Sequence, residues 1–162
     1  MNEKSTQTEE SNTIELDLII RRSPDSVRAW WTDLPSDYRA SDPREQPYQI
    51  LSKGLTANGD RELVCLWKSP DGSERQTEEI MHLSGDGLSW SFDVTGSGFS
   101  IRDNFKAVPA EGGTRLEIRS KITPIKPEVE AMVQTQKERM IQLWKSMVAI
   151  CERDAPNLPS RT

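Results

Sequence analysis

The chain has 162 residues and a formal net charge of −5. This length fits one domain with a substantial core, or a core and a cavity. The negative charge argues against a nonspecific nucleic-acid binder, which needs a basic field to neutralise phosphates. The chain has one histidine and two distant cysteines, Cys65 and Cys151. This inventory argues against a disulfide framework or a zinc site, so we expect no metal and no cofactor.

The two ends of the chain differ in composition from its middle. Residues 1–12 hold no apolar residue after Met1, so we expect a disordered N-terminal segment there. We expect one folded domain over residues 13–154 and a tail over 155–162. No apolar run resembles a signal peptide or approaches a membrane span. We therefore expect a cytoplasmic protein without stable membrane insertion.

A strand and a short helix are predicted first. Apolar and polar residues alternate over residues 13–21, which predicts a strand with one buried face. Ser23 suits a helix N-cap and Pro24 suits a first helical turn. The residues that then share one helical stripe are Val27, Trp30, Trp31 and Leu34. Pro35 ends this helix, and the proline-punctuated residues 35–47 predict a loop that is a candidate lid.

Six further strands and one long helix follow. Between Tyr48 and Ile122, short apolar runs are separated by turn signals such as Asn58-Gly59. This pattern predicts an antiparallel meander. From about Lys126 to Arg153, apolar residues recur at spacings of three and four, which predicts one amphipathic helix.

This order of elements resembles the SRPBCC superfamily, also called START-like or birch-pollen-allergen-like. The resemblance is carried by "IELDLIIRRSPDSVRAWWTDL", by the hairpin series and by "PEVEAMVQTQKERMIQLWKSMVAIC". It implies an α+β helix-grip fold: a curved seven-stranded antiparallel sheet around a long C-terminal helix, with one or two short helices after the first strand. It also implies a cavity between sheet and helix. Members of the superfamily bind lipids, sterols, polyketides, hormones or quinones, and some are cyclases or dehydratases.

Strand alternation identifies candidate cavity residues. Asp103 and Ser120 are polar residues on faces that are otherwise apolar. They either orient the polar end of a ligand or pair with another buried group. Gln136 interrupts the apolar stripe of the long helix. The residues that we expect to line the cavity are Trp31, Trp67, Trp90, Phe92, Ile101, Asp103, Phe105, Ile118, Ser120, Met132, Gln136 and Met140.

Three functions remain open from the sequence. The first is the binding of a hydrophobic small molecule or lipid by a monomer or homodimer. The second is a polyketide cyclase or dehydratase activity, with Asp103 and His82 as candidate proton-transfer groups. His82 shares a face with Ile80, and either face of its strand could be the inner one. The third is a protein-interaction module, as in relatives that activate chaperones. The size of the gap between helix and sheet separates these functions, because a small-molecule site needs room for its ligand.

Overall fold

The computed structural model describes residues 12–32, 48–68, 72 and 74–159. The predicted N-terminal segment, Leu34, Pro35 and the loop over 35–47 lie outside these residues, apart from Asn12. The elements, in chain order, are β1 (Thr13–Ile20), α2 (Pro24–Thr32), β2 (Tyr48–Leu55), β3 (Arg61–Lys68), β4 (Glu74–Leu83), β5 (Ser89–Gly96), β6 (Phe99–Ala110), β7 (Gly113–Pro124), the 3₁₀ helix η2 (Pro127–Met132) and α3 (Val133–Asp154).

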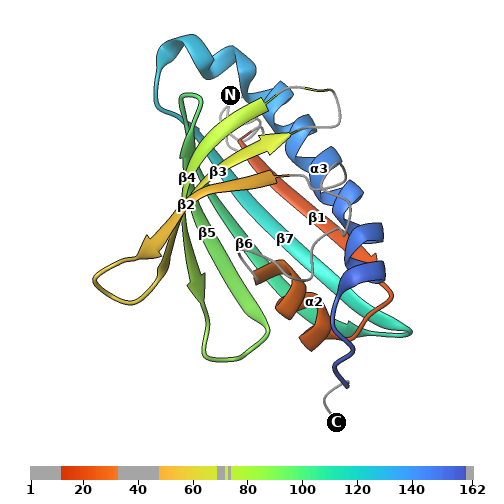
Figure 1. Cartoon of the computed structure of the whole chain (residues 1–162). Helices are drawn as coiled ribbons and strands as arrows, with labels where there is room; N and C mark the ends of the chain where they lie inside the picture. Colours follow the sequence, from red (N-terminus) through yellow and green to blue (C-terminus); the bar gives the residue numbers. More distant parts are fainter. Residues whose placement is uncertain (1–11, 33–47, 69–71, 73, 160–162) are drawn as a thin grey trace.

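The strands form one antiparallel sheet in the order β1-β7-β6-β5-β4-β3-β2. Each strand from β2 to β7 pairs with its neighbour in sequence, and β1 joins the far edge by pairing with β7. The helix α3 lies across one side of the sheet, while α2 lies near its lower end (Figure 1). The sheet face toward α3 is called the concave face below, and the opposite face the convex face. The predicted helix-grip architecture is confirmed.

The core lies between the concave face and α3. Alternate residues of β6 and β7 are buried, as the sequence pattern predicts. From α3, one stripe of side chains is buried against them, including Val133, Met140, Trp144 and Met147. Trp30 of α2 is fully buried and Trp31 is 3% exposed. The tandem tryptophans therefore close one end of the core.

The start of the long helix differs from the prediction. Residues 127–132 form a 3₁₀ helix with no buried residue, and the α-helix begins only at Val133. Pro127 occupies the first helical position. A 3₁₀ turn is common at the N-terminus of an α-helix. No helix among the described residues is long and apolar enough to cross a membrane.

The turn between β5 and β6 fixes the position of η2. Ser97 and Gly98 both have positive φ, 53° and 86°, as a tight type I′ hairpin turn requires. A Cβ atom on Gly98 would lie 2.9 Å from Cγ1 of Val129. The absent side chain therefore lets η2 approach the end of the sheet.

The described part of the C-terminal tail is docked. The Arg22 guanidinium donates to the carbonyl oxygens of Glu152, at 2.9 Å, and of Pro156, at 2.7 Å. Ser26 Oγ accepts from the backbone N–H of Leu158 at 3.0 Å. Residues 155–159 thus follow the junction between β1 and α2, which anchors the end of α3.

Candidate functional site

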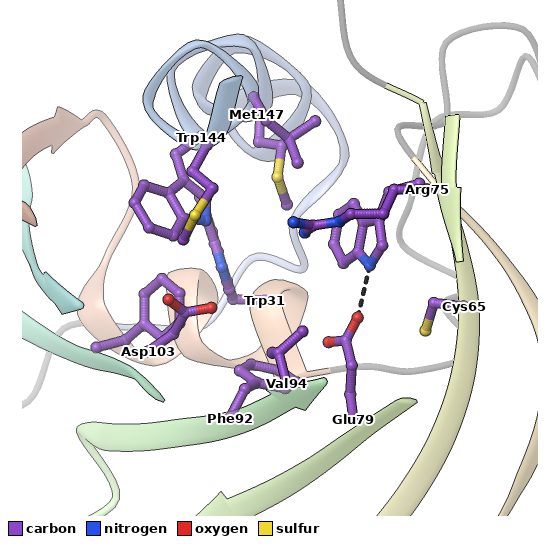
Figure 2. Close-up of a pocket in the computed structure, with 13 residues that line it drawn as sticks. Trp31, Cys65, Arg75, Glu79, Phe92, Val94, Asp103, Trp144 and Met147 are labelled. Carbon is purple, nitrogen blue, oxygen red and sulfur yellow. Dashed lines mark hydrogen bonds between the residues drawn. The ribbon is translucent and has the colours of Figure 1, made fainter. Parts of the chain in front are cut away.

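A central cavity lies between the concave face and α3, with a volume of about 50 Å³. Side chains from α2, β3, β4, β5, β6 and α3 surround it (Figure 2). The residues that line it are Trp31, Cys65, Trp67, Arg75, Glu79, Phe92, Val94, Asp103, Phe105, Met140, Leu143, Trp144 and Met147.

One wall of the central cavity is aromatic. Phe105 is the hub, with ring centroids 6.0 Å from Trp31, 6.0 Å from Phe92 and 5.9 Å from Trp144. The Phe92 and Trp144 rings meet it edge to face. Edge-to-face rings fix one another's orientation, so this wall is a rigid apolar surface. Met140 and Met147 supply a more adaptable surface from α3.

Glu79 brings a carboxyl group to the opposite side of the central cavity. It is 4% exposed and lies on the same face of β4 as Thr77 and Met81. One oxygen, Oε2, accepts from Trp67 Nε1 at 2.5 Å and from Thr77 Oγ1 at 2.6 Å (Figure 2 marks the bond from Trp67). Burial raises the pKa of Glu79, while these hydrogen bonds and the charge of Arg75 act against the rise.

Asp103 points into the central cavity from β6. It is 8% exposed, and its Oδ1 accepts from Ser120 Oγ at 2.5 Å across the β6–β7 pair. Burial raises the pKa of Asp103 to about 7, with a further upward contribution from Glu79 and opposing contributions from Ser120 and Arg75. A carboxyl group with this pKa exchanges its proton near neutral pH.

Arg75 adds a guanidinium group to the same space. It reaches in from β4, and Glu79 and Asp103 point into the cavity from the sheet (Figure 2). Its Nη1 atom is buried and has no hydrogen-bond partner. Burial lowers the pKa of Arg75, as does the neighbouring charge of Arg139, while Glu79 and Asp103 oppose the change. Arginine nevertheless stays charged at neutral pH.

A second space, called the side hollow, lies beside the central cavity near η2. Its volume is about 260 Å³, and it shares Trp67, Arg75, Met140 and Leu143 with the central cavity. Its other lining residues are Glu74, Ser97, Phe99, Val129, Met132, Gln136 and Arg139. Gln136 is 4% exposed, whereas Met132 is 42% exposed and lies at the rim.

The structure places most of the predicted cavity residues at one of these two spaces. Three of the others, Trp90, Ile101 and Ile118, are buried in the core and line neither space, contrary to the prediction. Trp90 stacks against Phe105 with centroids 5.4 Å apart. Alternation identifies the inward face of a strand, but the packing of α2 and α3 decides which part of that face borders a space. Ser120 also lines neither space, and it reaches the site through its bond to Asp103.

His82 does not belong to this site. It lies on the convex face, where Nδ1 is 3.0 Å from Asp60 Oδ2 and Nε2 is 2.8 Å from Asp93 Oδ2. Its strand buries Thr77, Glu79 and Met81, so position 82 faces the other way. Of the two faces that the sequence left open, His82 lies on the outer one, so it does not share the central cavity with Asp103.

The sequence interpretation missed Arg75 and Glu79 as site residues. Both share a face of β4 with Met81, but each face of this strand mixes apolar and polar residues. The sequence feature that could have identified this face is the alternating series Thr77, Glu79 and Met81. Its large apolar residue, Met81, indicates that the face is buried. Among the described residues, no group of three or more potential metal ligands is close enough to hold an ion.

Comparisons with known proteins support the fold. No protein-family profile matches the sequence, and no curated protein matches it. Among solved structures, Ms6760 from Mycobacterium smegmatis is 13% identical with a TM-score of 0.65, over 90% of this chain and 91% of that one. The structure of Ara h 8.0201 is 16% identical with a TM-score of 0.58, over 86% of this chain and 96% of that one.

A two-domain protein is also similar. The di-domain ARO/CYC protein StfQ, from the steffimycin biosynthetic pathway, is 12% identical with a TM-score of 0.63. The match covers 93% of this chain and 54% of StfQ. At these identities the similarity shows a shared helix-grip fold, the fold that the family resemblance implies.

Proposed function

We propose that this protein binds a hydrophobic small molecule or lipid between the sheet and α3. The observation that carries the proposal is the central cavity itself, where aromatic side chains and the charged groups of Arg75, Glu79 and Asp103 border one space. Buried charged groups cost free energy that well-packed apolar residues would not. Such groups, with shifted pKa values in an apolar cavity, are typical of binding sites.

The available volume limits the ligand. The central cavity of about 50 Å³ has room for water but not for a drug-sized molecule. Ligand pockets usually begin at about 300 Å³, which the central cavity and the side hollow reach only together. The side chains of Arg75 and Met140 border both spaces. We infer that a ligand occupies both, after the flexible side chain of Met140 turns aside.

A neutral solvatochromic dye tests this function. We expect Nile red to bind with a blue-shifted, enhanced emission, and we expect Val94→Phe to abolish this signal. Val94 lines the central cavity, so the larger ring fills it. Native mass spectrometry of the purified protein is expected to detect a co-purified apolar ligand.

Thr95→Phe is the matched control. Thr95 is the next residue of the same strand and is exposed on the convex face. We expect this variant to bind Nile red as the wild type does. Equal dye binding by Val94→Phe and the wild type, with both folded by circular dichroism, would contradict the proposed function.

A second candidate function is proton transfer to a bound polyketide or aromatic substrate, as in a cyclase or dehydratase. It is favoured by Asp103, whose pKa of about 7 suits a group that both accepts and donates protons at neutral pH. Asp103→Asn is expected to abolish turnover while the protein still binds substrate and remains folded. Unchanged turnover in this variant would remove Asp103 from the reaction.

A further inference from the structure

A charged group beside the central cavity has a donor without a partner, because Nη1 of Arg75 is buried without a hydrogen bond. Gln136 is a second buried polar group nearby, with a side chain that is 4% exposed. An unsatisfied buried donor is costly, and more so when it is charged. These two groups come from β4 and α3, and both line the side hollow.

The nearby carboxyl groups are already engaged. Glu79 accepts from Trp67 and Thr77, and Asp103 accepts from Ser120. No ion pair joins either carboxyl to Arg75 within the described part of the chain. Since burial raises the pKa of both carboxyls, their negative charge near Arg75 is reduced.

The charge of the side hollow favours an anion. Arg139 lines it beside Arg75 and is close enough to disfavour the charged form of that residue. Glu74 is the acidic residue in the lining, and it is exposed at the start of β4. An anion bound at Arg75 would supply the missing acceptor for its Nη1 atom.

We propose that the site binds an amphipathic carboxylic acid, with its carboxylate on Arg75 and Gln136 in the side hollow. The apolar body of this acid lies against Phe105, Trp31 and Trp144 in the central cavity. This inference rests on the proposed function and specifies its ligand class. A guanidinium matches a carboxylate in shape and charge, and the amide N–H of Gln136 is a second donor.

A matched pair of aromatic probes tests the inference. We expect 2-naphthoate to quench tryptophan fluorescence at concentrations at least about 10-fold lower than 2-naphthamide, since a charge-assisted hydrogen bond adds this much affinity. The two probes share one ring system and differ in charge. Their comparison isolates the contribution of the carboxylate.

Two variants locate the carboxylate. Arg75→Gln is expected to weaken 2-naphthoate binding by at least about 10-fold while leaving 2-naphthamide within about 3-fold. Gln136→Glu is expected to act in the same way, because it places a competing carboxylate beside Arg75. The control is Arg102→Gln on the convex face, where Arg102 pairs with Asp93, and we expect it to change neither affinity.

The outcomes separate the inference from the proposed function. Equal affinity of the two probes, or loss of both probes together in folded Gln136→Glu, would overturn the carboxylate assignment while leaving a ligand site in place. Failure of both probes and of Nile red to bind the wild type would overturn both proposals. If Arg75→Gln or Gln136→Glu fails to fold, the other variant alone tests where the carboxylate binds.

Discussion

The two faces of β5 and β6 carry similar residues in opposite surroundings. Asp93 and Asp103 lie on neighbouring strands, where Asp93 pairs with Arg102 and Phe92 pairs with Asp103. On the concave face, burial raises the pKa of Asp103 to about 7. On the convex face, partial burial of Asp93 favours a higher pKa, but hydrogen bonds from Arg102 and His82 outweigh it and the pKa is lowered.

This difference arises from what covers each face. The side chain of Asp93 is 47% exposed and is joined to two cationic or potentially cationic groups. Asp103 lies beneath α3 with one hydroxyl donor and an aromatic wall. The convex charges keep the surface hydrated at little cost, whereas the concave charges are expensive and therefore indicate a site.

The largest expected effect is on the pH dependence of stability. The pKa of Asp103 is about 7 in the folded protein against an ordinary value of 3.8. Between these values the unfolded chain loses a proton that the folded protein keeps, so stability falls as pH rises from about 4 to about 7. We expect Asp103→Asn to reduce this fall by up to about 4 kcal/mol, measured by urea unfolding across that range.

Asp93→Asn is the control for this series. The lowered pKa of Asp93 contributes stability above its ordinary value, which is lost only as the pH falls into the acid range. We expect the unfolding free energy of Asp93→Asn to decline between about pH 4 and 7, as that of the wild type does. An unchanged decline in Asp103→Asn would contradict the buried environment assigned to Asp103.

A smaller effect is expected from the Glu79 network. Glu79→Ala removes the acceptor of Trp67 Nε1 and Thr77 Oγ1 and should cost about 2 kcal/mol at neutral pH. Glu79→Gln keeps an acceptor oxygen and should cost less. Urea unfolding of both is compared with Glu78→Ala, at an exposed position, which should stay within about 0.5 kcal/mol of the wild type. A larger loss of unfolding free energy for Glu79→Gln than for Glu79→Ala would show that the carboxyl group of Glu79 destabilises the core.

The smallest effect is expected on the convex face. Asp93→Ala breaks the contacts with Arg102, at 2.8 Å, and with His82, at 2.8 Å. These groups are exposed, so the loss should be about 0 to 1 kcal/mol and should shrink at high salt. Thermal unfolding at low and high salt measures it. A cost as large as that of Glu79→Ala would remove the contrast between the faces.

The sequence predicted the fold because alternation and turn signals are local. It also identified Asp103 and Ser120 as polar residues on apolar faces, and the structure adds that they hydrogen-bond to each other across β6 and β7. Arg75 was missed because a long side chain on a strand usually reaches solvent, and only the covering helix α3 encloses its guanidinium. Trp90 was misplaced for a related reason, since local pattern does not determine which inward residues border a space.

The most direct test of the contrast is the titration of Asp103 and Asp93 side-chain carboxyl groups by carbon-13 chemical shift, in the ligand-free protein. The two aspartates are assigned through Asp103→Asn and Asp93→Asn. We predict a midpoint near pH 7 for Asp103 and a midpoint below the ordinary value for Asp93. Ordinary midpoints for both residues would contradict the account, because the concave face would then be as hydrated as the convex one.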